Sequence, residues 1–188
     1  MDTPLFYILL FVHLVSLIVG FGAVIVIDTF GLLWTMRRTR LKLVNQVANV
    51  TQRLIWIGWG GLVASGIGLI IFKGFIDNLT MIKLFFVAMV GINGVLLHKI
   101  KKQMEAHEID EVLPGNLRAR IAFSSVVSQI GWWGAIIIGF AHRQIRHVID
   151  WPPHPEYVIG ALAAIFILIG FLTMPRHKAK ALDRSHIF

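Results

Sequence analysis

Two histidines and one carboxylate stand inside long apolar stretches of this chain, where an ionisable side chain needs a physical reason to be buried. His13 and Asp28 fall within one apolar run, residues 11 to 38, and His142 closes another. A neutral imidazole can give its lone pair to a metal ion, and the metal bond then replaces the hydration lost on burial. A desolvated carboxylate can take up and release a proton. These residue types therefore point to metal ligation and to proton transfer.

The composition indicates the solvent that surrounds these residues. Of 188 residues, 56% are hydrophobic and 15% are charged, and the mean hydropathy is +0.74. Such values are typical of integral membrane proteins rather than of soluble domains. The absence of cysteine excludes disulfides, iron–sulfur clusters, thiolate metal sites and covalently attached c-type haem. Because the first positive charge is Arg37, no basic signal-peptide region precedes the first apolar stretch, and we expect that stretch to be retained.

The apolar stretches predict an all-α, polytopic membrane helix bundle with five transmembrane helices. Crossing about 30 Å of hydrocarbon takes about 20 residues of helix. The five predicted spans lie near residues 5–35, 54–76, 81–102, 119–142 and 156–174. The segment 38–53 has apolar residues close to helical spacing, which indicates either an interfacial helix on the membrane surface or an extension of the first span. With no internal repeat, residues 1–188 are expected to form a single integral membrane domain.

The basic residues predict how the spans are oriented. Fourteen of the eighteen Lys and Arg residues fall in residues 37–53, 99–120 and the tail after 175. Lys and Arg collect on the cytoplasmic side of membranes. We therefore expect the N-terminus outside and the C-terminus in the cytoplasm, in a bacterial inner membrane. The net charge of +8 is then a consequence of topology, and no nucleic-acid partner is expected.

This orientation gives each polar residue a depth, at about 1.5 Å per residue. His13 and His142 both lie in the outer half, whereas His98, at the inner end of the third span, is too far from His13 to share one metal ion. Four small residues accompany the outer histidines: Gly20, Gly131, Ala135 and Gly139. Such a stripe either leaves room for a flat group such as a porphyrin or lets helices pack closely. We expect haem b with His13 and His142 as its iron ligands and His98 as a secondary candidate.

Three polar residues on three different spans share a depth in the inner half, namely Asp28, Asn93 and Gln129. A carboxylate within a span costs about 3 kcal/mol or more, so Asp28 should face the bundle and find partners there. The cluster either fixes helix packing through hydrogen bonds or forms a proton or quinone site in which Asp28 titrates.

The first span also resembles a known group. His13, the glycine pair Gly20 and Gly22, and the basic Arg37 and Arg38 resemble small bacterial membrane proteins related to the copper-resistance CopD family and to the HemJ-type protoporphyrinogen oxidase. The resemblance covers about the first 75 residues and implies a b-type haem ligand at His13. The chain departs from the group in having Gly20 where Trp is common, and Asp28 has no counterpart. The resemblance thus implies haem and does not imply porphyrin oxidation.

Two functions from different classes remain open. The first is a b-type haem protein, a component of a membrane oxidoreductase, that transfers electrons between the quinone pool and an outer acceptor or partner subunit. The second is a non-catalytic membrane subunit or small transporter with structural histidines. Both place the protein in the lipid bilayer, with partner membrane subunits or a homo-oligomer as further partners. No nucleotide loop, hydrolase triad or zincin motif is found.

Overall fold

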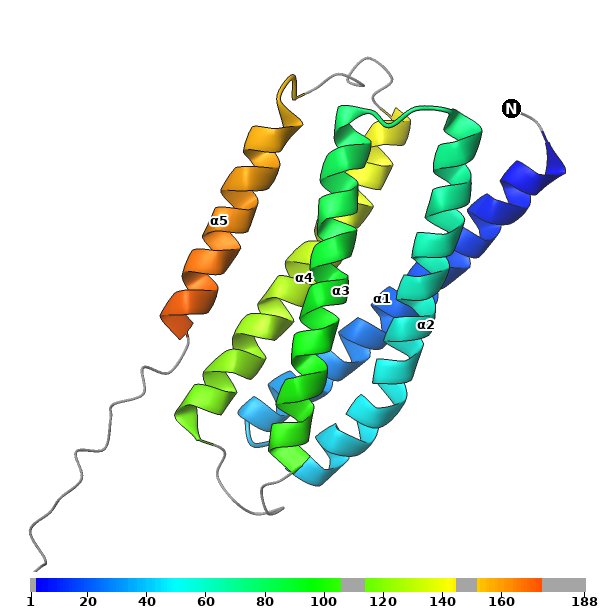
Figure 1. Ribbon diagram of the computed structural model, residues 1–188. Helices are drawn as coiled ribbons and strands as arrows, with labels where there is room; N and C mark the ends of the chain where they lie inside the picture. Colours follow the sequence, from blue (N-terminus) through cyan, green and yellow to red (C-terminus); the bar gives the residue numbers. More distant parts are fainter. Residues whose placement is uncertain (1–2, 106–113, 145–151, 174–188) are drawn as a thin grey trace, which may run out of the picture.

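The computed structural model describes residues 3–105, 114–144 and 152–173, and these ranges contain helices and no strand (Figure 1). The helices are α1 (Pro4–Thr35), α2 (Leu41–Lys73), α3 (Asn78–Glu105), α4 (Gly115–Gln144) and α5 (Pro155–Thr173). All five are long and apolar enough to cross a membrane. The predicted all-α helix bundle with five membrane-spanning helices is confirmed, and the chain is a multi-pass membrane protein.

The predicted segment 38–53 neither forms a helix of its own nor extends the first span. Residues 41–53 continue without a break into the second span, so that α2 is 33 residues long. Part of the apolar face of this segment is buried in the bundle, because Leu41 lies in a core cluster with Ile100 of α3 and Leu117 of α4, whereas Val50 of the same face is exposed. A short turn that includes Arg37, at a positive φ of 58°, separates α1 from α2.

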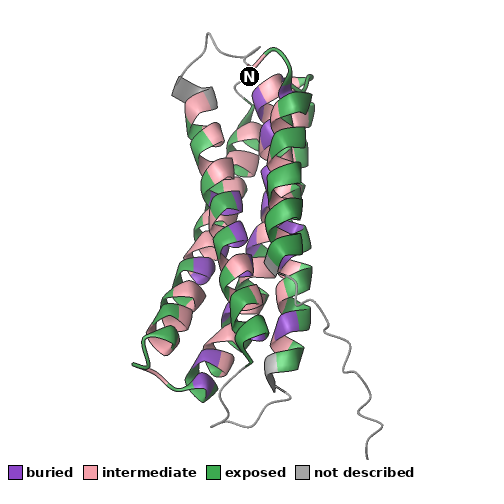
Figure 2. Ribbon diagram, turned by 90° about the vertical axis from the view of Figure 1, so that its left-hand side faces the viewer, coloured by how far each residue is buried: buried purple, intermediate pink, exposed green. Residues whose placement is uncertain are grey.

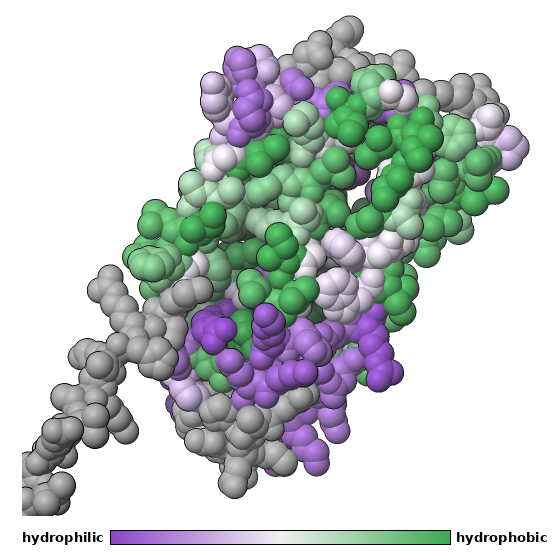
Figure 3. Space-filling view, in the orientation of Figure 1, coloured by the Kyte–Doolittle hydropathy of each residue, from purple (hydrophilic) through white to green (hydrophobic). Residues whose placement is uncertain are grey.

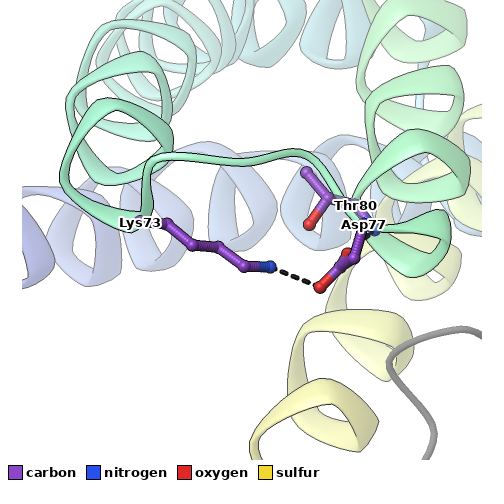
Figure 4. Close-up of polar contacts among 3 residues, drawn as sticks. All are labelled: Lys73, Asp77 and Thr80. Carbon is purple, nitrogen blue, oxygen red and sulfur yellow. Dashed lines mark hydrogen bonds and ion pairs between the residues drawn. The ribbon is translucent and has the colours of Figure 1, made fainter.

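The connection between α2 and α3 is closed by backbone and side-chain caps. Gly74 takes a left-handed φ of 80°, and its amide donates to the Ile70 carbonyl at 3.0 Å, which ends α2. Asp77 caps the next helix, because its carboxylate accepts a hydrogen bond from the Thr80 amide at 2.7 Å. Lys73 donates to the other oxygen of Asp77 (Figure 4). The buried carboxylate is thus held by a cation and by an amide.

The helices form two antiparallel pairs. We call α1 with α2 the first pair and α3 with α4 the second pair, since contacts within each pair greatly outnumber those between the pairs. The α5 helix lies beside α3 and α4 at the margin of the bundle (Figure 1). Buried positions collect on the faces that the helices turn toward one another, and exposed positions cover the outward faces (Figure 2). Many outward side chains are large and apolar, as expected where lipid is the solvent.

The two ends of the bundle differ in charge. We call the end at which α1 and α3 finish and α2 and α4 begin the basic end, and the other end the far end. The described cations of the basic end are Arg37, Arg38, Arg40, Lys42, Arg53, Lys99, Lys101, Lys102, Arg118 and Arg120. Hydrophilic side chains gather at this end, below a broad hydrophobic band (Figure 3).

Candidate binding cavity at the basic end

His13 faces α2 rather than α4. Its Nδ1 lies 2.9 Å from the Oγ of Ser65, and the Ser65 hydroxyl donates to the Gly61 carbonyl at 2.5 Å. A hydroxyl has a single proton to donate. The imidazole Nδ1 is therefore the donor toward Ser65, and Nε2 carries the lone pair of the neutral ring. His13 joins the two helices of the first pair.

The predicted small-residue stripe is filled by neighbouring side chains. A Cβ added at Gly20 would lie 2.7 Å from the Trp132 ring, and one added at Gly131 would lie 2.5 Å from the Cγ2 of Val90. Both glycines therefore serve as contact points for larger side chains. Ala135 is half-buried on α4. The close-packing alternative for this stripe agrees with these contacts.

A cation lies near His13. The side chain of Lys83 extends from α3 toward α4, because a Cβ added at Gly139 would lie 3.4 Å from its Nζ. Sequence reasoning did not predict a place for Lys83 inside the bundle. The Lys83 side chain is half-buried and lies near the imidazole of His13.

Side chains occupy two of the glycine positions that the predicted haem site would leave open. Trp132 packs against Gly20, and Val90 of α3 packs against Gly131. Within the described ranges, no group of three or more His, Cys, Asp or Glu residues could hold a metal ion. His142 belongs to α4, but its side chain lies outside what the structure describes, so its pairing with His13 stays a prediction. The secondary candidate His98 is exposed and contacts Gln52 of α2.

Asp28 joins the first pair to the second. Its Oδ1 accepts a hydrogen bond from the Oγ of Ser125 at 2.7 Å, and its Oδ2 accepts one from the Nε2 of Gln129 at 2.6 Å. The structure thus brings together Asp28 and Gln129, as their shared depth predicts. Sequence reasoning missed Ser125, although it stands one helical turn from Gln129 on the same face.

Asn93 does not join this cluster. Its Nδ2 donates to the backbone carbonyl of Ser124 at 2.8 Å, which holds α3 against α4. Adjacent residues of a helix point about 100° apart. Ser124 therefore faces α3 while Ser125 faces α1, and the two polar contacts lie on different sides of α4.

A cavity of about 1120 Å³ opens between the two pairs at the basic end. Small-molecule sites usually measure about 300–1,000 Å³, so this one is large. Its deep wall includes Val24 and Val90, and the rings of Trp34 and Trp56 line its sides. Asp28 lies in the wall seven residues before the end of α1, at a depth of about 10 Å. The lining of the cavity is mainly apolar, with a smaller number of polar side chains such as Asp28 and Gln52.

Four cations from three parts of the chain line the cavity near its mouth: Arg37 and Arg40 between α1 and α2, Lys101 of α3 and Arg118 of α4. Asp28 is the one carboxylate among the lining residues within the described ranges. Clustered charges of one sign beside low-dielectric walls attract ions of the opposite sign. The mouth of the cavity is therefore suited to an anionic group.

A second polar feature points into the same space. Asn45, on the first turns of α2, lines the cavity. Its Oδ1 is buried and has no hydrogen-bond partner in the described part of the protein. A buried acceptor without a partner is costly. A bound molecule with a hydroxyl, amine or amide donor would supply the missing bond.

No family model, curated protein or solved structure matches this chain.

Proposed function

We propose that this protein binds an amphipathic anion in the cavity at the basic end and acts as a non-catalytic membrane carrier or binding subunit. One observation carries the proposal: a cavity of about 1120 Å³ combines apolar walls with four cations at its mouth. The apolar part of the ligand lies against Val24 and Val90, and its anionic group meets the cations. A donor group on the ligand meets the Oδ1 of Asn45.

The polar groups support binding rather than acid–base catalysis. General acid–base chemistry needs a titrating group close to the reacting atoms, and histidine is used most often. The lining residues within the described ranges contain one carboxylate, Asp28, and no histidine. Both oxygens of Asp28 accept hydrogen bonds from α4. We assign Asp28 the role of holding the two pairs at the spacing that the ligand requires.

A quinone is the weaker alternative. The apolar walls suit the ring and tail of a quinone, but a neutral quinone has no charge to pair with the cations at the mouth. An amphipathic anion contacts both the apolar walls and the cations. Partner membrane subunits and a homo-oligomer remain compatible with the exposed apolar side chains of the outward helix faces.

We also propose that the basic end faces the cytoplasm of a bacterial inner membrane, because it is the end richest in Lys and Arg. The anionic group of the ligand then lies at the level of the inner leaflet. A reporter fused after Phe188 should be active in the cytoplasm, and one inserted at Pro152 should be active outside. The opposite pattern would overturn this orientation.

Binding is tested with dodecyl phosphate as the anionic probe and dodecanol as its neutral counterpart. We expect the purified protein to bind dodecyl phosphate more tightly than dodecanol, as measured by titration calorimetry in a neutral detergent. Added salt should weaken this preference. The variant Arg40→Gln/Arg118→Gln should bind dodecyl phosphate about tenfold more weakly. Its matched control, Arg38→Gln/Arg120→Gln, removes the same charge from cations that do not line the cavity.

Equal affinity for the two probes, or equal weakening in both double variants, would overturn the proposal. The first result would mean that the mouth does not select for charge. The second would mean that only the overall charge of the basic end matters.

A further inference from the structure

A second hollow lies beside the cavity. It has a volume of about 670 Å³ and lies between α2 and α3 at the basic end, where Arg53, Val95 and His98 are exposed. We call it the outer groove. Gln52, Trp56 and Lys101 line both the outer groove and the cavity. The two spaces are therefore separated there by side chains.

Hydrogen bonds connect the side chains of this wall. The Nε2 of Gln52 lies 2.8 Å from the Nδ1 of His98, and the Nζ of Lys101 donates to the Oε1 of Gln52 at 3.2 Å. We call Gln52, His98 and Lys101 the clasp. An amide nitrogen can only donate, so the Nδ1 of His98 is the acceptor. Because the clasp consists only of side chains, rotamer changes open it without moving a helix.

The other seams of the bundle are closed by close packing or, between α1 and α4, by side-chain hydrogen bonds that are less exposed than the one between Gln52 and His98. Between α1 and α2, a Cβ added at Gly58 would lie 2.4 Å from the Cα of Gly20, so the two backbones touch. Between α3 and α4, a Cβ added at Gly134 would lie 2.8 Å from the Phe86 ring. Between α1 and α4, Asp28 makes its two hydrogen bonds.

The seam between α2 and α3 is closed above the groove as well. The Nε1 of Trp59 donates to the Val87 carbonyl at 2.9 Å, and the ring of Trp59 lies 2.7 Å from a Cβ added at Gly91. An opening at the clasp is therefore limited to the basic end of this seam. In the proposed orientation, the basic end lies at the level of the inner-leaflet headgroups.

The chemistry of the outer groove matches a lipid of this kind. Val95 is an apolar side chain with 48% of its surface exposed, and it suits an acyl chain. Arg53 lies in the groove, and Lys101 lies in the wall common to both spaces. An anionic headgroup moving inward passes from Arg53 to Lys101 and then to Arg118 at the mouth of the cavity, so that its charge stays close to a cation.

We propose that the ligand is an anionic lipid of the surrounding bilayer, carrying a phosphate headgroup, and that it enters the cavity sideways between α2 and α3 when the clasp opens. This inference rests on the proposed function and names its ligand and its route. A water-soluble phosphate compound that enters through the mouth has the same headgroup chemistry, and the experiment separates the two sources.

The cysteine-free chain allows a single reporter thiol. Ala48 lines the cavity and not the outer groove, so Ala48→Cys reports access to the cavity. The protein is placed in phosphatidylcholine nanodiscs and labelled either with an alkyl maleimide, which partitions into the bilayer, or with a sulfonated maleimide, which stays in water. The clasp variant is Gln52→Ala/His98→Ala. Its control is Asn49→Ala, which changes a groove residue outside the clasp.

We expect the clasp variant to react about tenfold faster with the alkyl maleimide, because losing the clasp hydrogen bonds raises the open population. The sulfonated maleimide should react at the parental rate, and Asn49→Ala should change neither rate. In the parent protein, replacing part of the phosphatidylcholine by phosphatidylglycerol should slow labelling by the alkyl maleimide, because the anionic lipid competes for the cavity. If the double variant does not fold, the single variant Gln52→Ala removes the same hydrogen bonds and should show the same faster reaction with the alkyl maleimide.

An unchanged rate with the alkyl maleimide, in a folded clasp variant that still prefers dodecyl phosphate, would overturn sideways entry and leave the proposed function standing. Equal acceleration of both reagents would also overturn it, because the clasp would then control the mouth. A parent protein with no preference for dodecyl phosphate would instead overturn the proposed function itself.

Discussion

The basic half and the far half of the bundle contain the same four helices, yet one encloses a cavity and the other is tightly packed. From the crossing of Gly20 and Gly58 toward the far end, most glycines of α1 to α4 are in contact with a neighbouring helix, with Gly60 and Gly74 as exceptions. In the basic half, Gly31 and Gly115 have nothing within 4 Å of an added Cβ, and both line the cavity. Glycine is therefore not by itself a packing signal. Its effect depends on whether a partner lies opposite.

The difference follows from how helices associate in lipid. Without a hydrophobic driving force between apolar helices, close packing and polar contacts must hold them together. The far half uses close packing within each pair. The basic half relies on side-chain hydrogen bonds between the pairs, at Asp28 and at the clasp. The cavity lies between these two sets of bonds.

The largest expected effect comes from filling a contact in the packed half. Gly58→Leu should destabilise the protein by about 3 kcal/mol or prevent folding, because the added side chain meets the backbone of Gly20 and overpacking costs this much. Gly60→Leu, two residues away with nothing within 4 Å of its added Cβ, should melt close to the parent. Thermal unfolding in detergent measures both, and equal melting temperatures would mean that the helices do not touch at Gly58.

A smaller loss of stability is expected when the polar contact of Asp28 in the basic half is removed. Asp28→Leu should lower the free energy of unfolding by about 2 kcal/mol, because it leaves the donors of Ser125 and Gln129 unpaired. Ser125→Ala removes one bond and should cost about half as much. Denaturant unfolding in mixed micelles gives both values. A stability of Asp28→Leu at or above that of the parent would show that Asp28 does not hold the pairs together.

A still smaller effect is expected at His13. A double-mutant cycle with His13→Ala and Ser65→Ala should give a coupling free energy of about 0.6 kcal/mol, the average for hydrogen bonds between membrane helices. The same cycle with His13→Ala and Gly60→Ala should give no coupling, because nothing lies within 4 Å of a Cβ added at Gly60. A coupling to Ser65 that is indistinguishable from zero would contradict the packing role of the imidazole.

The last prediction concerns haem, for which we expect no absorption signal. With the space at Gly20 and Gly131 occupied by Trp132 and Val90, we expect the dithionite-reduced protein, expressed with added haem, to lack a b-type α-band. An α-band that both His13→Ala and His142→Ala abolish would instead establish the haem ligation that the sequence predicts, and the far half would then have to open.

The sequence by itself determined the five spans, because length and apolar composition are local properties of the chain. It also placed Asp28 and Gln129 at one depth, since depth follows from the distance to the basic residues that flank each span. The contact between them agrees with that reasoning. The argument from residue spacing could not predict that residues 41–53 belong to α2. This depends on the burial of Leu41 against α3 and α4.

Only the tertiary structure decided which helix each residue faces. His13 meets Ser65 on α2, although depth alone equally allowed α4, and Asn93 meets a backbone carbonyl rather than Asp28. In water, the apolar face of a helix identifies its buried side. In lipid, buried and exposed faces are both apolar, so the rotation of each helix and the choice of its neighbour are set by the packing of the whole bundle.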